Sequence, residues 1–213
     1  MKDWTGNANS IYKTLGASNH TEDERQSEDF YSTQKQTVLS LLNKLKEYDI
    51  NLSNSVMIEP AVGSGNILKA CFETNEGYNK YLAYDIVDRG FPNTKVIDFL
   101  TVSKEEMPAE TKTIITNPPY SLAKEFVEHS MELLDNDEYC IMLLKIQFLE
   151  GKARKELFKK YPPKCIYVSS SRILCAKNGD FEGMKKSGGS AVAYAWYEWE
   201  KGYTGDTIIK WVN

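Results

Sequence analysis

The four residues Asn117-Pro118-Pro119-Tyr120 combine side chains and backbone groups that suit chemistry on an amino group. Two successive prolines fix two φ angles and remove two N–H donors, which leaves carbonyl acceptors in a stiff loop. The residue before a proline is held in extended geometry, so the Asn117 side chain is directed away from the preceding strand. The Asn117 amide oxygen and the Pro118 carbonyl would accept both N–H groups of an exocyclic amine. The nitrogen lone pair would then be free to attack a methyl group, with the Tyr120 ring stacked on the flat ring that carries the amine.

A second Pro-Pro pair occurs in Tyr161-Pro162-Pro163-Lys164, where no asparagine precedes it. Pro-Pro pairs are common in turns, because proline presets one backbone angle of a turn. We interpret this second pair as a turn without a chemical role.

A loop with two glycines, Glu59-Pro60-Ala61-Val62-Gly63-Ser64-Gly65, precedes the asparagine motif in the chain. Gly63 and Gly65 permit a tight turn and a close approach of the backbone to a ligand. The following helix start presents free N–H groups. The pattern is neither GxGxxG nor a phosphate-binding loop with Lys-Ser/Thr, which disfavours dinucleotides and nucleoside triphosphates. Taken alone, the two glycines also fit a plain strand-to-helix turn.

Two further predicted strand ends carry candidate ligand groups. Asp85 follows Gly65 by about 20 residues, where a carboxylate can accept hydrogen bonds from both hydroxyls of a ribose. Asp98 and Phe99 offer a carboxylate beside an aromatic face, which suits an adenine ring. The alternatives are that Asp85 is a turn residue and Phe99 a core residue. Together the three strand ends predict an adenosine compound that needs no phosphate cradle, and S-adenosylmethionine fits that description.

Hydrophobic periodicity predicts the elements that position these residues. The predicted strands are 56–58, 81–84, 95–97, 113–115, 140–144, 166–168 and 191–199, and the predicted helices are 34–48, 66–72, 121–134 and 151–160. Strands that alternate with helices favour a mostly parallel sheet with helices on both faces. We therefore expect an α/β, Rossmann-like fold in which the last two strands form an antiparallel edge hairpin.

The whole chain has 213 residues, 41% hydrophobic and 26% charged, which is enough for one globular domain. No apolar run approaches the roughly 20 residues of a membrane span. The N-terminus, Met1-Lys2-Asp3-Trp4, lacks a signal-peptide core, so we expect a cytoplasmic protein without membrane contact. The net charge of -4 argues against a protein that holds nucleic acid by bulk charge alone.

The sequence gives no sign of cysteine or metal chemistry. Four cysteines, Cys71, Cys140, Cys165 and Cys175, are far apart and form no CxxC pair, so we expect them to be reduced and mostly buried. None stands near Asn117 in the sequence, and a covalent intermediate is not expected. The two histidines offer no cluster of ligands, and no metal is expected.

These motifs resemble those of the amino-group DNA methyltransferases that use S-adenosylmethionine, particularly the adenine-N6 kind. The cofactor loop of that family resembles 59–65, and its catalytic motif resembles 117–120. Asp29-Phe30-Tyr31-Ser32-Thr33 resembles its N-terminal cofactor motif, a Tyr-x-Thr-Pro. The resemblance, which covers most of residues 29 to 200, implies a class I methyltransferase fold. It implies cofactor contacts by Tyr31, Thr33, Glu59, Pro60, Gly63, Gly65, Asp85, Asp98 and Phe99, catalytic roles for Asn117, Pro118 and Tyr120, and a substrate contact by Pro119.

The chain departs from the family at several points. Gln34 stands where the family has proline, and Ile67 replaces a frequent phenylalanine. We expect an irregular N-terminal segment, 1–33, that caps cofactor and substrate, followed by a catalytic domain, 34–213. A separate target-recognition domain is not expected. The start, with Gly16-Ala17-Ser18-Asn19-His20, resembles small methyltransferases carried by phages and prophages.

A duplex buries the adenine N6 atom, so such an enzyme must flip the base out or act on a single strand. The segment 177–189, with Phe181, Lys185 and Lys186, is the favoured substrate-binding loop, because the corresponding loop of related methyltransferases gives an aromatic face to the flipped base. Lys152 to Lys164 form a second basic stretch, for which a solvated helix face is favoured.

The motif leaves other readings open. The same Asn-Pro-Pro-Tyr motif occurs in release-factor glutamine methyltransferases, and RNA adenine is a further substrate. A non-catalytic relic that binds S-adenosylmethionine is a reading of another class. The oligomeric state is open, with a monomer favoured.

Overall fold

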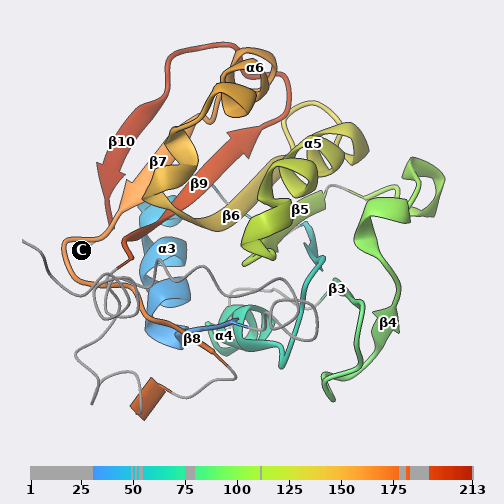
Figure 1. Cartoon of the computed structure of the whole chain (residues 1–213). Helices are drawn as coiled ribbons and strands as arrows, with labels where there is room; N and C mark the ends of the chain where they lie inside the picture. Colours follow the sequence, from blue (N-terminus) through green and yellow to red (C-terminus); the bar gives the residue numbers. More distant parts are fainter. Residues whose placement is uncertain are drawn as a thin grey trace, which may run out of the picture.

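The structure, a computed structural model, describes residues 31–48, 50, 52, 55–74, 80–110, 112–177, 181–182 and 192–212. Its centre is an eight-stranded sheet in the order β10-β7-β9-β6-β5-β2-β3-β4 (Figure 1). The strands of this sheet are β2 Val56–Glu59, β3 Tyr81–Asp85, β4 Thr94–Val96, β5 Lys112–Thr116, β6 Tyr139–Lys145, β7 Cys165–Val168, β9 Tyr194–Glu200 and β10 Ile208–Trp211.

The sheet is mostly parallel, as the alternation of strands and helices predicts. Strand β9 is the exception, since it pairs antiparallel with both β6 and β7. The expected antiparallel pair of β7 and β9 is therefore present, but β9 lies inside the sheet. The outermost strand on that side is β10, which runs parallel to β7 and was not predicted.

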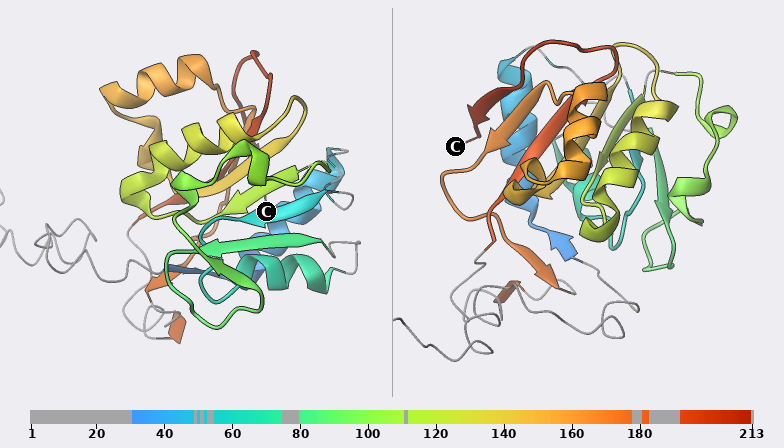
Figure 2. Two further views of the ribbon diagram at one scale, coloured as in Figure 1. Left: turned by 90° about the vertical axis from the view of Figure 1, so that its right-hand side faces the viewer. Right: turned by 45° about the horizontal axis from the view of Figure 1, so that its top comes forward.

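Helices cover both faces of the sheet, which confirms the expected class (Figure 2). Helices α3 (Lys35–Glu47) and α4 (Asn66–Glu73) pack on one face, and α5 (Ala123–Leu133) and α6 (Lys152–Lys160) pack on the other. Successive residues of β6 pack alternately on the two faces of the sheet. Ile141 and Leu143 belong to the core under α3 and α4, whereas Met142 and Leu144 belong to the core under α5 and α6. This is the two-residue period of a strand buried on both sides.

Short turns and a small ribbon complete the described chain. Single 3₁₀ turns occupy Phe99–Thr101, Lys104–Glu106, Tyr120–Leu122 and Ile146–Leu149. Strands β1 (Tyr31–Thr33) and β8 (Cys175–Lys177) form a separate antiparallel ribbon, with Tyr31 opposite Lys177. Neither strand was predicted, because three residues are too few to show an alternating pattern.

Among the helices that the structure describes, none is long and apolar enough to cross a membrane. All four cysteines are buried, as expected.

Candidate active site

The predicted site residues meet at one edge of the sheet. Strands β2, β3 and β5 are parallel neighbours, with Ile58 opposite both Leu82 and Ile114. Their carboxyl ends therefore lie side by side. Glu59 and Asp85 are the last residues of β2 and β3, and Asn117 directly follows β5. In open α/β sheets this edge is where ligands bind.

The Asn117 side chain has a defined orientation. Its Nδ2 group donates a hydrogen bond to the Tyr31 carbonyl at 3.0 Å. A carbonyl can only accept, so this contact assigns the donor end of the amide to Tyr31 and turns Oδ1 away from it. Oδ1 is buried and has no hydrogen-bond partner among the described residues. The Asn117 side chain therefore presents an unpaired acceptor oxygen in a fixed orientation.

The rest of the motif forms a compact turn around an aromatic ring. Pro118 is buried, and the Pro119 carbonyl accepts a hydrogen bond from the Leu122 N–H at 2.9 Å, which closes the turn. The Tyr120 ring centroid lies 5.8 Å from that of Tyr31 and 5.6 Å from that of Tyr194. Burial raises the pKa of Tyr120 well above its usual value, so its hydroxyl stays neutral.

The structure brings one cysteine to the motif that the sequence did not place there. Cys175 in β8 interacts with the Tyr120 side chain. Burial raises the pKa of the Cys175 thiol to about 12, so it remains protonated at neutral pH. A protonated thiol is a poor nucleophile, and its place beside Tyr120 gives no route to a covalent intermediate.

The glycine loop is shaped by close contacts. Gly65 has φ +78°, and a Cβ atom there would lie 1.9 Å from the Phe91 ring. Only glycine fits that position, for both the backbone angle and the space. The Gly63 N–H donates to Asp85 Oδ2 at 2.8 Å, which ties the loop to the end of β3.

Strand β1 connects the glycine loop to the asparagine motif. The Asn66 Nδ2 group, at the start of α4, donates to the Thr33 carbonyl at 3.2 Å, while Asn117 donates to the Tyr31 carbonyl. Two backbone carbonyls of β1 therefore anchor both loops. Sequence reasoning missed Asn66, and the residues themselves carry no signal of this bridge.

Glu59, the last residue of β2, is a buried acid. It is 2% exposed, and its Oε2 atom has no hydrogen-bond partner among the described residues. Burial, above all, and the nearby charge of Asp85 raise the pKa of Glu59 well above its usual value. The carboxyl group accepts a hydrogen bond from the Leu68 backbone, which opposes this rise in part. A buried carboxylate with one oxygen unpaired is still unfavourable, and a cationic ligand group would relieve it.

The two aspartates differ in exposure. Asp85 is buried, and its second oxygen, Oδ1, accepts from the Val87 N–H at 3.1 Å. Asp98 is exposed, and its Oδ1 accepts from the Leu100 N–H at 3.0 Å. Each carboxylate oxygen has two lone pairs, so both aspartates can still accept from a ligand.

Phe99 does not show the open aromatic face that the sequence predicts, and its contact with a cofactor stays a prediction. Its side chain is 1% exposed and packs against Tyr84, Phe126 and His129, so its ring belongs to the core and offers no open face. Phe99 follows the strand end but turns into the layer between the sheet and α5. Ile86, next to Asp85, is instead 70% exposed and is an apolar surface that sequence reasoning overlooked.

The predicted substrate loop is only partly described. Phe181 is half-buried, while Lys185 and Lys186 lie outside the described residues, so the roles of these three residues stay predictions. In the second basic stretch, Lys159, Lys160 and Lys164 form ion pairs with Glu156, Glu132 and Glu200. These pairs favour the solvated-face interpretation of that stretch.

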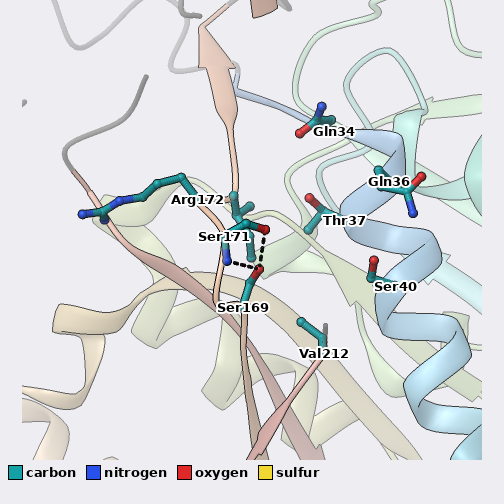
Figure 3. Close-up of a pocket in the computed structure, with 9 residues that line it drawn as sticks. Gln34, Gln36, Thr37, Ser40, Ser169, Ser171, Arg172 and Val212 are labelled. Atoms are coloured by element: carbon teal, nitrogen blue, oxygen red, sulfur yellow. Dashed lines mark hydrogen bonds between the residues drawn. The ribbon is translucent and has the colours of Figure 1, made fainter. Parts of the chain in front are cut away.

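A polar pocket of about 120 Å³ lies next to the ribbon, between the start of α3 and the segment after β7 (Figure 3). Gln34, Thr37 and Ser40 line one side, and Ser169 and Ser171 line the other. Asn117, Glu59 and Asp85 are not part of its lining, so this pocket is separate from the site at the strand ends.

No protein-family model and no curated protein matches this sequence. Solved structures do match. The methyltransferase subunit of a type I restriction-modification system from Streptococcus thermophilus has a TM-score of 0.61 at 15% identity; the match covers 86% of this chain and 47% of that one. A Listeria monocytogenes protein described as a class I S-adenosylmethionine-dependent methyltransferase has a TM-score of 0.58 at 12% identity, over 95% and 70% of the two chains.

A protein from Pyrococcus horikoshii described as an RNA methyltransferase has a TM-score of 0.55 at 11% identity, over 81% of this chain and 87% of that one. At such identities the likeness concerns the fold. This chain has the fold of the class I S-adenosylmethionine-dependent methyltransferases.

Proposed function

We propose that this protein transfers the methyl group of S-adenosylmethionine to the N6 amino group of adenine in DNA. The observation that carries the proposal is the Asn117 side chain, whose Nδ2 is held by the Tyr31 carbonyl and whose buried Oδ1 has no partner among the described residues. A buried acceptor without a donor is unfavourable in a folded protein. Its presence at the ligand-binding edge of the sheet is explained if a substrate N–H completes it.

The motif supplies acceptors and a ring, and no acid or base. Asn117 Oδ1 would accept one N–H of the adenine amino group, and the Pro118 carbonyl would accept the other. Both interactions strengthen as the nitrogen becomes positive, so they stabilise the transition state more than the bound substrate. The N–C bond would form as the S–C bond breaks, and the methylated nitrogen would then release one proton to solvent. Tyr120, neutral at working pH, would hold the base by stacking, and Pro119 would contact it at the turn.

The residues at the strand ends fit S-adenosylmethionine. When bound, this compound supplies a methyl group on a positively charged sulfur together with a positively charged amino group. The unpartnered Oε2 of Glu59 matches a cationic group, and Asp85 can accept from the ribose hydroxyls. The exposed Asp98 carboxylate suits the adenine amino group, and Ile86 gives the apolar face that Phe99 does not provide. Pro60, Gly63 and Gly65 shape the loop, and Tyr31 and Thr33 would close the site from β1.

DNA is the substrate that the observations favour. The similar structures include a restriction-modification methyltransferase subunit, and the motif resembles the adenine-N6 family. A flipped adenine would enter beside Tyr120, with Phe181, Lys185 and Lys186 as the proposed contacts. The similar protein described as an RNA methyltransferase keeps RNA adenine as a second candidate.

The test is methyl transfer from labelled S-adenosylmethionine, with DNA, RNA and protein fractions offered together and then separated. Label on DNA, on N6 of adenine, is the expected result, and the Asn117→Ala variant should give almost none. Label confined to RNA or to protein would overturn the proposed substrate. Cofactor binding without transfer to any fraction would favour a non-catalytic protein.

A further inference from the structure

Lys145 is a basic residue at the candidate active site that the motif does not account for. Strand β5 ends with Thr116 opposite Met142, and β6 continues to Lys145. The end of β6 therefore reaches the level of the Asn117 loop. The Lys145 Nζ atom lies 5.0 Å from the centroid of the Tyr120 ring, within the range of a cation–π contact.

The charge of Lys145 is not neutralised by a carboxylate in the part of the chain that the structure describes. Many other lysines there do form ion pairs, including Lys35 with Glu73, Lys80 with Glu110 and Lys112 with Glu138. Lys145 is half-buried, which makes an unpaired ammonium group less favourable than it would be on the open surface. In a protein with a net charge of -4, this cation stands beside the ring proposed to hold the substrate.

We propose that Lys145 binds a backbone phosphate of the nucleotide whose base enters the Asn117 site. This inference rests on the proposed function. An ammonium group only donates hydrogen bonds, so it has no use for the amino group that Asn117 and Pro118 would hold. The negatively charged acceptor that a nucleotide brings close to its own base is its phosphate, and lysine binds phosphate as a point charge.

The contact with Tyr120 stabilises the Lys145 ammonium group before a substrate binds. Without substrate, the ammonium group has the ring as its partner. A base that stacks on the same ring competes with it, and the long lysine side chain can turn aside without breaking an ion pair. The phosphate that arrives with the base then replaces the ring. Lys145 thereby links entry of the base to capture of its backbone, which is a substrate-binding role distinct from the acceptor role of Asn117.

The first test measures DNA binding and KM as a function of salt for the wild type, Lys145→Met and Lys145→Arg. Lys80→Met is the matched control, since it removes the same charge from an exposed lysine that precedes β3, at the opposite end of the strand. Lys145→Met should weaken binding about tenfold at low salt and reduce the slope of log Kd against log salt by roughly 0.7–0.9, the value for one phosphate contact. Lys145→Arg should retain most of the affinity, and Lys80→Met should change the slope little. Unchanged cofactor affinity would show that Lys145→Met is folded.

The second test uses oligonucleotides in which a methylphosphonate neutralises one phosphate next to the methylated adenine. One such position should weaken wild-type binding about as much as Lys145→Met does, and the two changes together should cost no more than either alone. If Lys145→Met weakens binding equally for every oligonucleotide with a neutralised phosphate, the phosphate contact is overturned. Lys145 would then act on the ring or the base. A wild-type protein that methylates no DNA would overturn the proposed function and this inference together. Methylation of DNA with an unchanged salt slope in Lys145→Met would overturn this inference alone.

Discussion

Two loops of this protein each contain a Pro-Pro pair, and they lie at opposite ends of the strands of the sheet. Asn117-Pro118-Pro119-Tyr120 follows the carboxyl end of β5, and Tyr161-Pro162-Pro163-Lys164 precedes β7. In the second loop the Tyr161 carbonyl accepts from the Trp199 indole N–H at 3.1 Å, and the Lys164 N–H donates to the Glu198 carbonyl at 2.7 Å. In the first loop, the Asn117 side chain keeps its acceptor oxygen unused.

The difference between the loops shows what a rigid turn can be used for. In both, proline removes N–H donors and stiffens the backbone. In the loop before β7, a donor and an acceptor of β9 pair with the polar groups of the loop, and these contacts stabilise the fold. In the loop after β5, the contact with β1 completes only the donor end of the asparagine, so the acceptor end remains for a ligand. The interpretation of the second pair as a plain turn agrees with these contacts.

The largest expected effect comes from a substitution in the first loop. Asn117→Ala should lower the single-turnover rate of methyl transfer by about a hundredfold or more, comparable to the loss of one preorganised polar partner in other enzymes. Cofactor affinity should stay within a few fold, because Asn117 is assigned to the substrate side. The matched control is Pro162→Ala, which alters the second loop and should leave the rate unchanged. Transfer by Asn117→Ala at the wild-type rate would end the proposed mechanism.

A smaller effect, on stability, should follow from a change at the second loop. Trp199→Phe removes the donor to the Tyr161 carbonyl from a fully buried position. The free energy of unfolding should fall by about 2 kcal/mol, through the unpaired carbonyl and the lost volume. Urea denaturation measures this fall, and methyl transfer by the folded variant should match the wild type. A transfer rate as low as that of Asn117→Ala would mean that the two loops do not differ as described.

The smallest expected effect concerns the polar atoms left unpaired at the active-site edge. The pKa of Glu59 is raised in the folded state, so the folded protein holds this proton more tightly than the unfolded chain. The stability that Glu59 contributes is present below its pKa in the unfolded chain, near 4.5. This stability is lost as the pH rises towards the higher pKa of Glu59 in the folded protein. Glu59→Gln should abolish this loss of stability with rising pH, and the variant should be more stable than the wild type at pH 7 without cofactor.

Urea denaturation between pH 5 and 8, without cofactor, tests the role of Glu59. Calorimetry should show weaker S-adenosylmethionine binding by Glu59→Gln, because a neutral amide replaces the carboxylate. An identical pH profile in the two proteins would contradict the assignment of Glu59 as a group kept buried for a ligand.

Much of the fold follows from local pattern. The alternation of short apolar runs with helical periodicity predicts the strands from β2 to β7 and the helices α3, α4, α5 and α6 to within a few residues. The pattern works because a doubly covered parallel sheet needs buried, mostly apolar strands, such as Val56–Glu59, and helices with one apolar face, such as Lys35–Glu47. Strands β1 and β8 escaped prediction because three residues are too few to show an alternating pattern, and β10 because it is short and mostly exposed.

For the candidate site, the residue types in the sequence already specify the chemistry available: a stiff acceptor loop around Asn117, glycines at 63 and 65, and acids at the strand ends. These are properties of residue type and of immediate neighbours. The groups that are used depend on the tertiary structure. It turned Phe99 into the core, placed Cys175 and Lys145 beside Tyr120, and brought the Tyr31 carbonyl to Asn117 across 86 positions of sequence. Such contacts follow from strand order and register, and because these arise from packing of the whole sheet, no local pattern specifies them.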